Sequence, residues 1–380
     1  MNEIELSIVL PCLNEEKTLH VCLTKASDSI SKLNLEGEII VADNGSTDSS
    51  LKIAEQFGAK IVNVAVKGYG AALIEGIKSA KGKYIIMGDS DDSYALDQLE
   101  EFISKLREGN DLVMGNRFKG GIEKGAMPWL HKYVGNPLLS FIGRLFFKVP
   151  IHDFHCGLRG FKRDAILKLN LISTGMEFAS EMIVKAALSN LKITEVPTKL
   201  KPDGRDRAPH LRTWRDGWRH LIFLLASSPR WLFLYPGIFL FTLGTLGMIL
   251  TSSGEVHIFN LNLNLNSFLV FTSLVLAGAQ TILMGLIARV FASEHGFLPV
   301  SKEFSFFEKY FTLERGITLG LFLIFSSGIW FVKLISDWTG TKFNNFDLYT
   351  SVRISATLLL ALVLGFQILF ASFFASLMKA

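Results

Sequence analysis

The chain contains 380 residues, of which 49% are hydrophobic, and its 39 basic and 35 acidic side chains leave a formal net charge of +4. This near balance, without a Lys/Arg-dense tail, argues against a nucleic-acid partner. The hydrophobic residues are unevenly spread: residues 1–229 have the composition of a globular protein, whereas long apolar runs dominate from Trp231 onward.

The first 230 residues alternate between strand and helix patterns. Strands are predicted at residues 5–10, 38–42, 60–66, 83–87 and 111–114, and helices at 15–33, 48–57, 69–80 and 97–107. Such an alternation predicts an α/β fold with a mostly parallel sheet that is covered by helices on both faces. In sheets of this kind, ligands bind at the carboxyl ends of the strands.

The second half contains apolar stretches that are long enough to cross a bilayer, at about 231–252, 267–292, 316–336 and 354–378. At 1.5 Å per residue, each can span the roughly 30 Å hydrocarbon core of a membrane. A soluble core that buried all of them would need more residues than the rest of the chain offers. We therefore predict an α/β domain over 1–210, an interfacial amphipathic helix over 211–230, and an all-α membrane domain of four helices over 231–380.

Basic residues predict the orientation in the membrane. A cluster precedes the first span, and the middle loop (293–315) is also basic; the residues are Arg205, Arg207, Arg212, Arg215, Arg219, Arg230, Lys302, Lys309 and Arg315. The loop at 253–266 has neither Lys nor Arg, and the loop at 337–352 has only Lys342. We therefore expect a multi-pass membrane protein whose α/β domain, middle loop and C-terminus are cytoplasmic.

The three cysteines and the N-terminus agree with a cytosolic α/β domain. Cys12, Cys22 and Cys156 are odd in number and have no Cys-x-x-Cys spacing, which argues against a disulfide framework or a zinc site and favours reduced thiols. The N-terminus has no basic region before its short apolar run, so we expect no signal peptide. Segments 214–225 and 137–149 are amphipathic, as in helices that lie in the lipid headgroup plane; for the second, an ordinary core-packing helix is an equal alternative.

An acidic cluster follows the predicted strand at 83–87. Like charges as close as those of Asp89, Asp91 and Asp92 are unfavourable unless a cation neutralises them. Because Mg²⁺ prefers carboxylates together with phosphate oxygens and water, an Asp-x-Asp pair here indicates a clamp for a metal–diphosphate complex. Alone, the pattern is weak, since short acidic turns are more often solvated loops.

Three other polar clusters end strands or begin helices. Asp43, before the turn NGSTD, can accept hydrogen bonds from a base or ribose, although such a segment also forms Asx-turns and helix caps. Asn14 and Glu15 follow the first strand, and Glu15 is equally suited to the first turn of a helix. Gly68 lies in a Gly-rich turn that lets the backbone approach a phosphate. The turn matches neither Walker A nor GxGxxG, so ATP or dinucleotide binding is not supported.

Several motifs together make the sequence recognisable. The ordered segments PCLNEE, DNGSTDSS, KGYGAAL, GDSDD, GNR, DFHCGLRGFKRDA, GMEFASEM and EVPTKL resemble glycosyltransferase family 2 enzymes of GT-A (Rossmann-like) fold, in particular the dolichyl- or polyprenyl-phosphate sugar synthases. The resemblance covers roughly residues 5–230. The membrane half is similar only in having C-terminal helices.

This resemblance implies roles for individual residues. Asp89 and Asp91 would hold Mg²⁺ or Mn²⁺ on the donor diphosphate, and Arg117 would bind the acceptor phosphate, with Lys132 as a second contact. The nucleotide-sugar pocket would include Pro11, Asn14, Glu15, Asp43, Gly68, Asp89, Ser90, Asp91 and Arg205. The branch often has a second basic residue followed by a serine, but this chain has His131-Lys132 and then Gly135-Asn136. Ser93 replaces a glutamine of the branch, which leaves the third metal ligand open.

The expected reaction is inverting transfer of a hexose from a nucleotide-sugar to a polyprenyl or dolichyl phosphate. UDP-glucose is favoured as donor and GDP-mannose remains an alternative; a homo-oligomer is left open. One rival is a processive polysaccharide synthase, but Ser227 stands where its Gln-x-x-Arg-Trp motif needs glutamine. Another is a transporter or flippase, whose spans should carry charged residues. Here Gln280 and Gln367 are the main polar features, and both are expected to hydrogen-bond between helices.

Overall fold

The computed structural model describes residues 4–205, 213–295, 298, 309, 312–340 and 348–379. Arg207, Arg212, Lys302 and Lys342, which contribute to the orientation argument, lie outside these residues, as do residues 211 and 212 of the predicted interfacial helix. The chain divides into two compact units, Met1–Leu224 and Leu225–Ala380.

The N-terminal unit is built on a seven-stranded sheet of order β3-β2-β1-β4-β6-β5-β7. Its strands are β1 (Leu6–Cys12), β2 (Gly37–Asp43), β3 (Lys60–Asn63), β4 (Tyr84–Met87), β5 (Leu112–Asn116), β6 (Arg159–Lys162) and β7 (Ile193–Pro197). Only β6 is antiparallel to its neighbours, β4 and β5. The predicted mostly parallel α/β sheet is therefore confirmed. β6 was not predicted, because a strand as short and basic as Arg159-Gly-Phe-Lys162 shows no apolar alternation.

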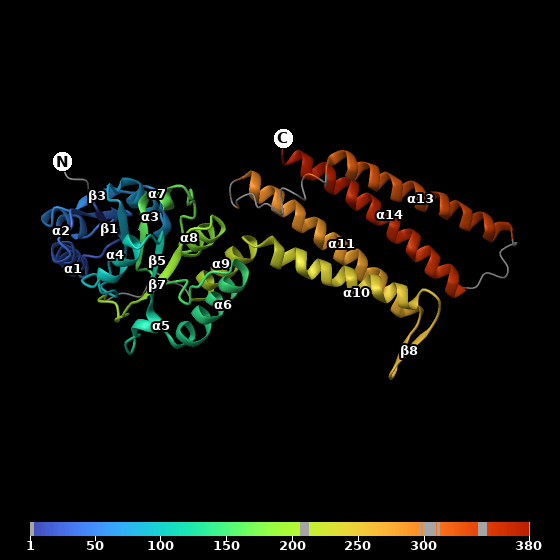
Figure 1. The fold of residues 1–380 in the computed structure, drawn as a ribbon, viewed down its shortest axis with the longest axis horizontal. Helices are drawn as coiled ribbons and strands as arrows, with labels where there is room; N and C mark the ends of the chain where they lie inside the picture. The colour runs from blue at the N-terminus through green and yellow to red at the C-terminus, as the bar shows by residue number, and fades with distance from the viewer. Residues whose placement is uncertain are drawn as a thin grey trace. The chain divides into compact units, whose positions relative to one another are not determined.

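Helices cover both faces of this sheet (Figure 1). On β1, Ile8 and Leu10 pack against one set of helices, whereas Val9 between them packs against another, as the period of a strand requires. The first face is covered by α1 (Leu19–Lys32), α2 (Ser50–Gln56) and α4 (Glu100–Arg107), and the second by α3 (Tyr69–Ser79), α7 (Arg163–Leu167) and α8 (Phe178–Leu188). The helices cover the faces of the sheet, so the carboxyl ends of the parallel strands are where a ligand is expected to bind.

Two further helices of this unit expose apolar side chains. In α9 (Thr213–Ala226), Trp214 is 81% and Trp218 61% exposed, while the polar Asp216 and His220 face inward and are buried. In α6 (Asn136–Phe147), which follows the π-helical turn η1 (His131–Gly135), the outward residues are Leu138, Phe141 and Leu145. This pattern is the reverse of that on a water-facing helix, and exposed apolar faces of this kind indicate contact with a membrane or partner.

The C-terminal unit consists of long apolar helices. Among the described residues, four helices are long and apolar enough to cross a membrane: Arg230–Thr251, which joins the π-helical turn η2 (Arg230–Leu234) to α10 (Tyr235–Thr251), α11 (Leu265–Glu294), α13 (Leu313–Gly340) and α14 (Leu348–Leu377). A short hairpin of β8 (Val256–Ile258) and β9 (Leu261–Leu263) connects α10 to α11. The predicted four-helix transmembrane region is confirmed.

Small residues allow these helices to pack closely. α10 packs on α11, α11 on α14, and α14 on α13 (Figure 1). A Cβ atom added at Gly320 would lie 2.8 Å from the carbonyl oxygen of Gly365, and the reverse holds as well. Glycines at such crossings let the two backbones approach closely. The van der Waals packing that results is one of the forces that hold helices together in lipid.

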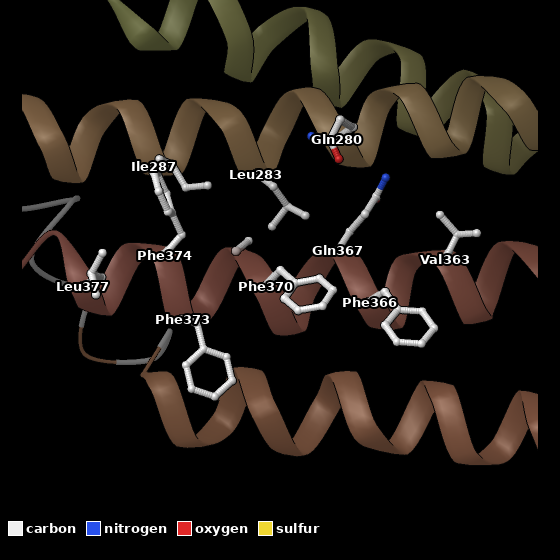
Figure 2. A pocket seen from close by; sticks show the side chains of 11 residues that line it. Gln280, Leu283, Ile287, Val363, Phe366, Gln367, Phe370, Phe373, Phe374 and Leu377 are labelled. Atoms are coloured by element: carbon white, nitrogen blue, oxygen red, sulfur yellow. The ribbon is translucent and has the colours of Figure 1, made fainter.

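Two glutamines face each other between α11 and α14 (Figure 2). Gln280 and Gln367 border a pocket of about 700 Å³ whose other side chains are apolar, including four phenylalanines of α14. Gln367 Oε1 is buried and has no hydrogen-bond partner among the described residues. No hydrogen bond joins the two amides among the described residues, so the interhelical hydrogen bonds expected from the sequence are not formed here.

Candidate active site

A cleft of about 1060 Å³ opens at the carboxyl ends of β1, β4 and β5. Residues of α6 and α9 also line it, so the exposed apolar helices border the same cavity. The predicted site residues in its lining are Pro11, Glu15, Gly68, Asp89, Ser90, Asp91, Arg117 and Arg205. Asn14, Asp43 and Lys132 are absent from the lining.

Asp89 stands in the crowded centre of the cleft. Its Oδ1 accepts a hydrogen bond of 2.9 Å from the Tyr69 hydroxyl. Burial, and then repulsion from Asp91, raises the pKa of Asp89 from 3.8 to about 6. Gly157 leaves room for the carboxylate, since a Cβ atom at that position would lie 2.5 Å from Asp89 Oδ2. The protein therefore holds this carboxylate where its negative charge is unfavourable without a cation.

Arg205 connects Asp91 to Glu15, which follows β1. Arg205 forms an ion pair with Glu15 at 2.7 Å and lies 3.3 Å from Asp91 Oδ2. Asp91 Oδ1 accepts hydrogen bonds from the Ser93 hydroxyl at 2.6 Å and from its backbone N–H at 3.1 Å. Ser93, which stands in place of the glutamine of the branch, thus orients the neighbouring carboxylate. Arg205 lies in the predicted donor pocket, paired with two carboxylates.

The acidic pair fits a divalent cation. Asp89 and Asp91 both offer carboxylate oxygens, the ligand type that Mg²⁺ and Mn²⁺ prefer. Within the described ranges, no group of three or more His, Cys, Asp and Glu residues could hold a metal ion. The chain would therefore supply a cation with two carboxylates and leave other positions to phosphate oxygens and water, which is common for Mg²⁺ bound with a nucleotide.

Arg117 is held by Asp153, a residue that was not singled out from the sequence. Its Nε and Nη2 each donate a hydrogen bond of 2.7 Å to the Asp153 carboxylate, which is fully buried. Burial disfavours the charged guanidinium, but Asp153 offsets this and raises the pKa of Arg117 well above its ordinary value. Arg117 thus lines the cleft with two of its five guanidinium N–H donors bonded to Asp153. The only signal for Asp153 in the sequence was its place in the DFHC segment.

Lys132, the second acceptor contact expected from the sequence, lies outside the cleft lining. Lys132 Nζ lies 5.5 Å from the centre of the Tyr133 ring, in a cation–π contact, and Lys132 does not line the cleft. Its neighbour His131 does. The side chains of successive residues in a helical turn point in different directions, so His131 takes the position in the cleft that was assigned to Lys132.

Asp43 and Asn14 connect loops behind the cleft. The Asp43 carboxylate accepts hydrogen bonds from the backbone N–H groups of Gly45 at 2.9 Å and Ser46 at 3.1 Å, so it forms the Asx-turn itself. Asn14 Oδ1 accepts a 2.7 Å bond from the N–H of Thr47. Asn44, missed from the sequence, lines the cleft and accepts a 2.7 Å bond from the Gly68 N–H.

Comparisons with known proteins identify the family. A model of glycosyl transferase family 2 matches residues 7–169, and a model of the family's C-terminal transmembrane region matches residues 286–379. The low-salt glycan biosynthesis hexosyltransferase Agl6 of Haloferax volcanii is 35% identical over 97% of this chain and 87% of its own length. The chain belongs to glycosyltransferase family 2. It is thus a glycosyltransferase, and its four apolar helices together with the transmembrane family match make it an integral membrane protein.

Two other known proteins are similar to this family 2 enzyme. The dolichyl-phosphate hexose transferase of Haloferax volcanii is 27% identical over 51% of this chain and 81% of its own length. Among solved structures, glucosyl-3-phosphoglycerate synthase from Mycobacterium tuberculosis, in complex with Mn²⁺, UDP and glucosyl-3-phosphoglycerate, is 24% identical. The structural match covers 59% of this chain and 80% of the synthase chain, with a TM-score of 0.46.

Proposed function

We propose that this family 2 enzyme transfers a hexose from a nucleotide-sugar to the phosphate of a polyprenyl or dolichyl lipid. One observation carries the proposal: a single cleft is lined both by the carboxylates Asp89 and Asp91 and by α6 and α9, whose outward faces are apolar. The first pair suits a charged diphosphate donor, and the helices suit an acceptor that remains in a membrane. The similarity to the glycan biosynthesis hexosyltransferase Agl6 and to the dolichyl-phosphate hexose transferase supports this choice.

The donor would bind at the carboxylate end of the site. Asp89 and Asp91 would hold Mg²⁺ or Mn²⁺, which neutralises charge on the leaving diphosphate when bound. Arg205, now paired with Glu15 and Asp91, is within the same cleft and would contact the donor phosphates. UDP-glucose is the favoured donor, from the family resemblance, with GDP-mannose as the alternative.

The acceptor phosphate is anionic at neutral pH, so the reaction needs no strong general base. Arg117 would attract this phosphate through the part of its guanidinium that Asp153 does not use. One acceptor oxygen forms a bond to the anomeric carbon while the bond from that carbon to the nucleotide diphosphate breaks. In-line displacement inverts the carbon, so an α-linked donor gives a β-linked lipid product.

The distribution of Lys and Arg supports a cytoplasmic location for the α/β unit and the C-terminus. On that side, Trp214, Trp218 and the exposed leucines and phenylalanine of α6 would lie among the lipid headgroups, where tryptophan is favoured. The lipid phosphate would then reach the cleft without leaving the bilayer surface. The four spans would anchor the enzyme there.

The test uses the full-length protein in nanodiscs with one polyprenyl phosphate and a panel of radiolabelled nucleotide-sugars. We expect a lipid that carries a single sugar, and its formation should require a divalent cation. Asp89→Ala should abolish transfer, whereas Asp164→Asn, an exposed carboxylate outside the cleft, should leave it unchanged. A polymeric product would instead indicate a processive synthase, and transfer by Asp89→Ala at the wild-type rate in EDTA would exclude the metal role.

A further inference from the structure

We propose that His155 is a second contact for the acceptor phosphate, beside Arg117, and that Ser180 and His220 set the orientation of its ring. This inference rests on the proposed function and deepens it. His155 lies two residues after Asp153, the carboxylate that holds Arg117. Both Arg117 and His155 line the cleft. One short loop therefore holds Arg117 through Asp153 and also carries His155.

His155 has one nitrogen in use and one that remains available. Its Nε2 lies 3.4 Å from the Ser180 hydroxyl, and its Nδ1 is buried without a hydrogen-bond partner among the described residues. A buried ring nitrogen without a partner is unfavourable, and native proteins rarely retain one without a reason. A ligand that enters the cleft would supply the missing partner.

A histidine pair fixes the orientation of this ring. The rings of His155 and His220 are 4.4 Å apart in an edge-to-face arrangement, and the Ser180 hydroxyl also lies 2.9 Å from His220 Nδ1. A hydroxyl has one hydrogen, so it donates to one imidazole and accepts from the other. If Ser180 donates to His155 Nε2 and accepts from His220 Nδ1, the neutral His155 ring carries its proton on Nδ1. That nitrogen is then an unused hydrogen-bond donor on a residue that lines the cleft.

The charges around His155 favour an anion as the partner. Arg117 and Asp153 together are neutral, so this pair alone does not balance a phosphate group. Arg159 is fully buried behind the same loop, and its three guanidinium nitrogens donate only to backbone carbonyls. Burial, and then the charges of His220 and Arg117, lowers the pKa of His155 well below its ordinary value. The Arg159 charge, whose hydrogen-bond partners are all backbone carbonyls, favours an anion bound nearby.

The acceptor is favoured over the donor because of where the second histidine comes from. His220 lies on α9, the helix that exposes Trp214 and Trp218, and α9 lines the cleft. The Ser180 hydroxyl on α8, which contacts both histidines, therefore connects α9 to the loop of Asp153 and His155. A lipid phosphate that enters the cleft between α6 and α9 would therefore meet Arg117 and His155.

Three substitutions separate the two nitrogens. His155→Phe keeps a ring against His220 but removes both nitrogens. The side-chain amide of His155→Asn can place a donor near the position of Nδ1, whereas that of His155→Gln reaches the position of Nε2. His20→Ala serves as a matched control, because His20 is exposed on α1 and outside the cleft lining. All variants are assayed as full-length protein with polyprenyl phosphate and nucleotide-sugar, and thermal melting reports folding.

We expect His155→Phe and His155→Gln to raise the acceptor KM roughly ten-fold or more, as the loss of a hydrogen bond to a charged group does. His155→Asn should stay near wild type, and the donor KM should not change in any variant. The inference is overturned if Gln rather than Asn preserves the acceptor KM, since that pattern means a structural role through Ser180. It is also overturned if no variant changes the acceptor KM, or if donor and acceptor KM rise together. Should the Phe variant not fold, the Asn and Gln pair decides. A wild-type enzyme that makes no lipid-linked sugar would instead refute the proposed function.

Discussion

Replacing Asp89 by asparagine should stabilise the protein while it abolishes transfer. The side chain keeps its shape, and the amide oxygen can still accept the hydrogen bond from Tyr69. The charge is lost, and this charge is unfavourable in the fold, because burial and Asp91 raise the pKa of Asp89 from 3.8 to about 6. At 1.36 kcal/mol per pKa unit, that rise corresponds to about 3 kcal/mol of lost stability once the group is ionised.

The sign of this effect depends on pH. Below about pH 3.8 the carboxyl group is protonated in both folded and unfolded chains, so it carries no penalty. The penalty grows between pH 3.8 and about 6 and is complete above that range. Asp89→Asn should therefore melt at a higher temperature than wild type at pH 8. The gain should disappear near pH 4.

The assay is thermal melting of full-length protein in detergent with EDTA, followed by tryptophan fluorescence between pH 4 and 8. For a unit of this size, about 3 kcal/mol corresponds to a shift of roughly 6–12 °C. Asp91→Asn is the comparison variant: it relieves the repulsion on Asp89 but also loses a contact with Arg205, so its gain in melting temperature should be smaller than that of Asp89→Asn. A lower melting temperature for Asp89→Asn at pH 8, or a difference that stays constant across the pH range, would refute the reasoning.

Three other substitutions test the site and the membrane unit. Asp153→Asn leaves the buried Arg117 without its counter-charge and should lower the free energy of unfolding by about 3–5 kcal/mol, measured as a lower melting temperature. Gly157→Ala forces the Asp89 carboxylate to move and should reduce kcat/KM about 100-fold with little change in melting. Gln367→Leu removes a buried amide oxygen that has no partner, so melting in detergent should stay unchanged or rise; a marked fall would mean that the amide has a partner in the membrane.

Much of the fold follows from local pattern. Short β-rich apolar runs, such as that of β1, predicted the five principal strands, and uninterrupted apolar length predicted the four spans. β6 and β7 were not predicted from the sequence. β6 is only four residues long and has basic residues at both ends. A strand of this kind is held by its neighbours β4 and β5, and such pairing is invisible in the segment itself.

The sequence by itself also determined part of the cleft, since polar groups that end parallel strands meet at one edge of a sheet. Asp89, Asp91 and Glu15 were expected there from strand ends and Arg205 from the family resemblance, and all four line it, whereas Asn14, Asp43 and Lys132 do not. What those side chains bind to was decided only by the tertiary structure. Asp153 accepts two hydrogen bonds from the Arg117 guanidinium, and Asp43 closes its own turn instead of lining the cleft. Hydrogen-bond partners far apart in the chain depend on how the loops are packed, and no local spacing encodes that packing.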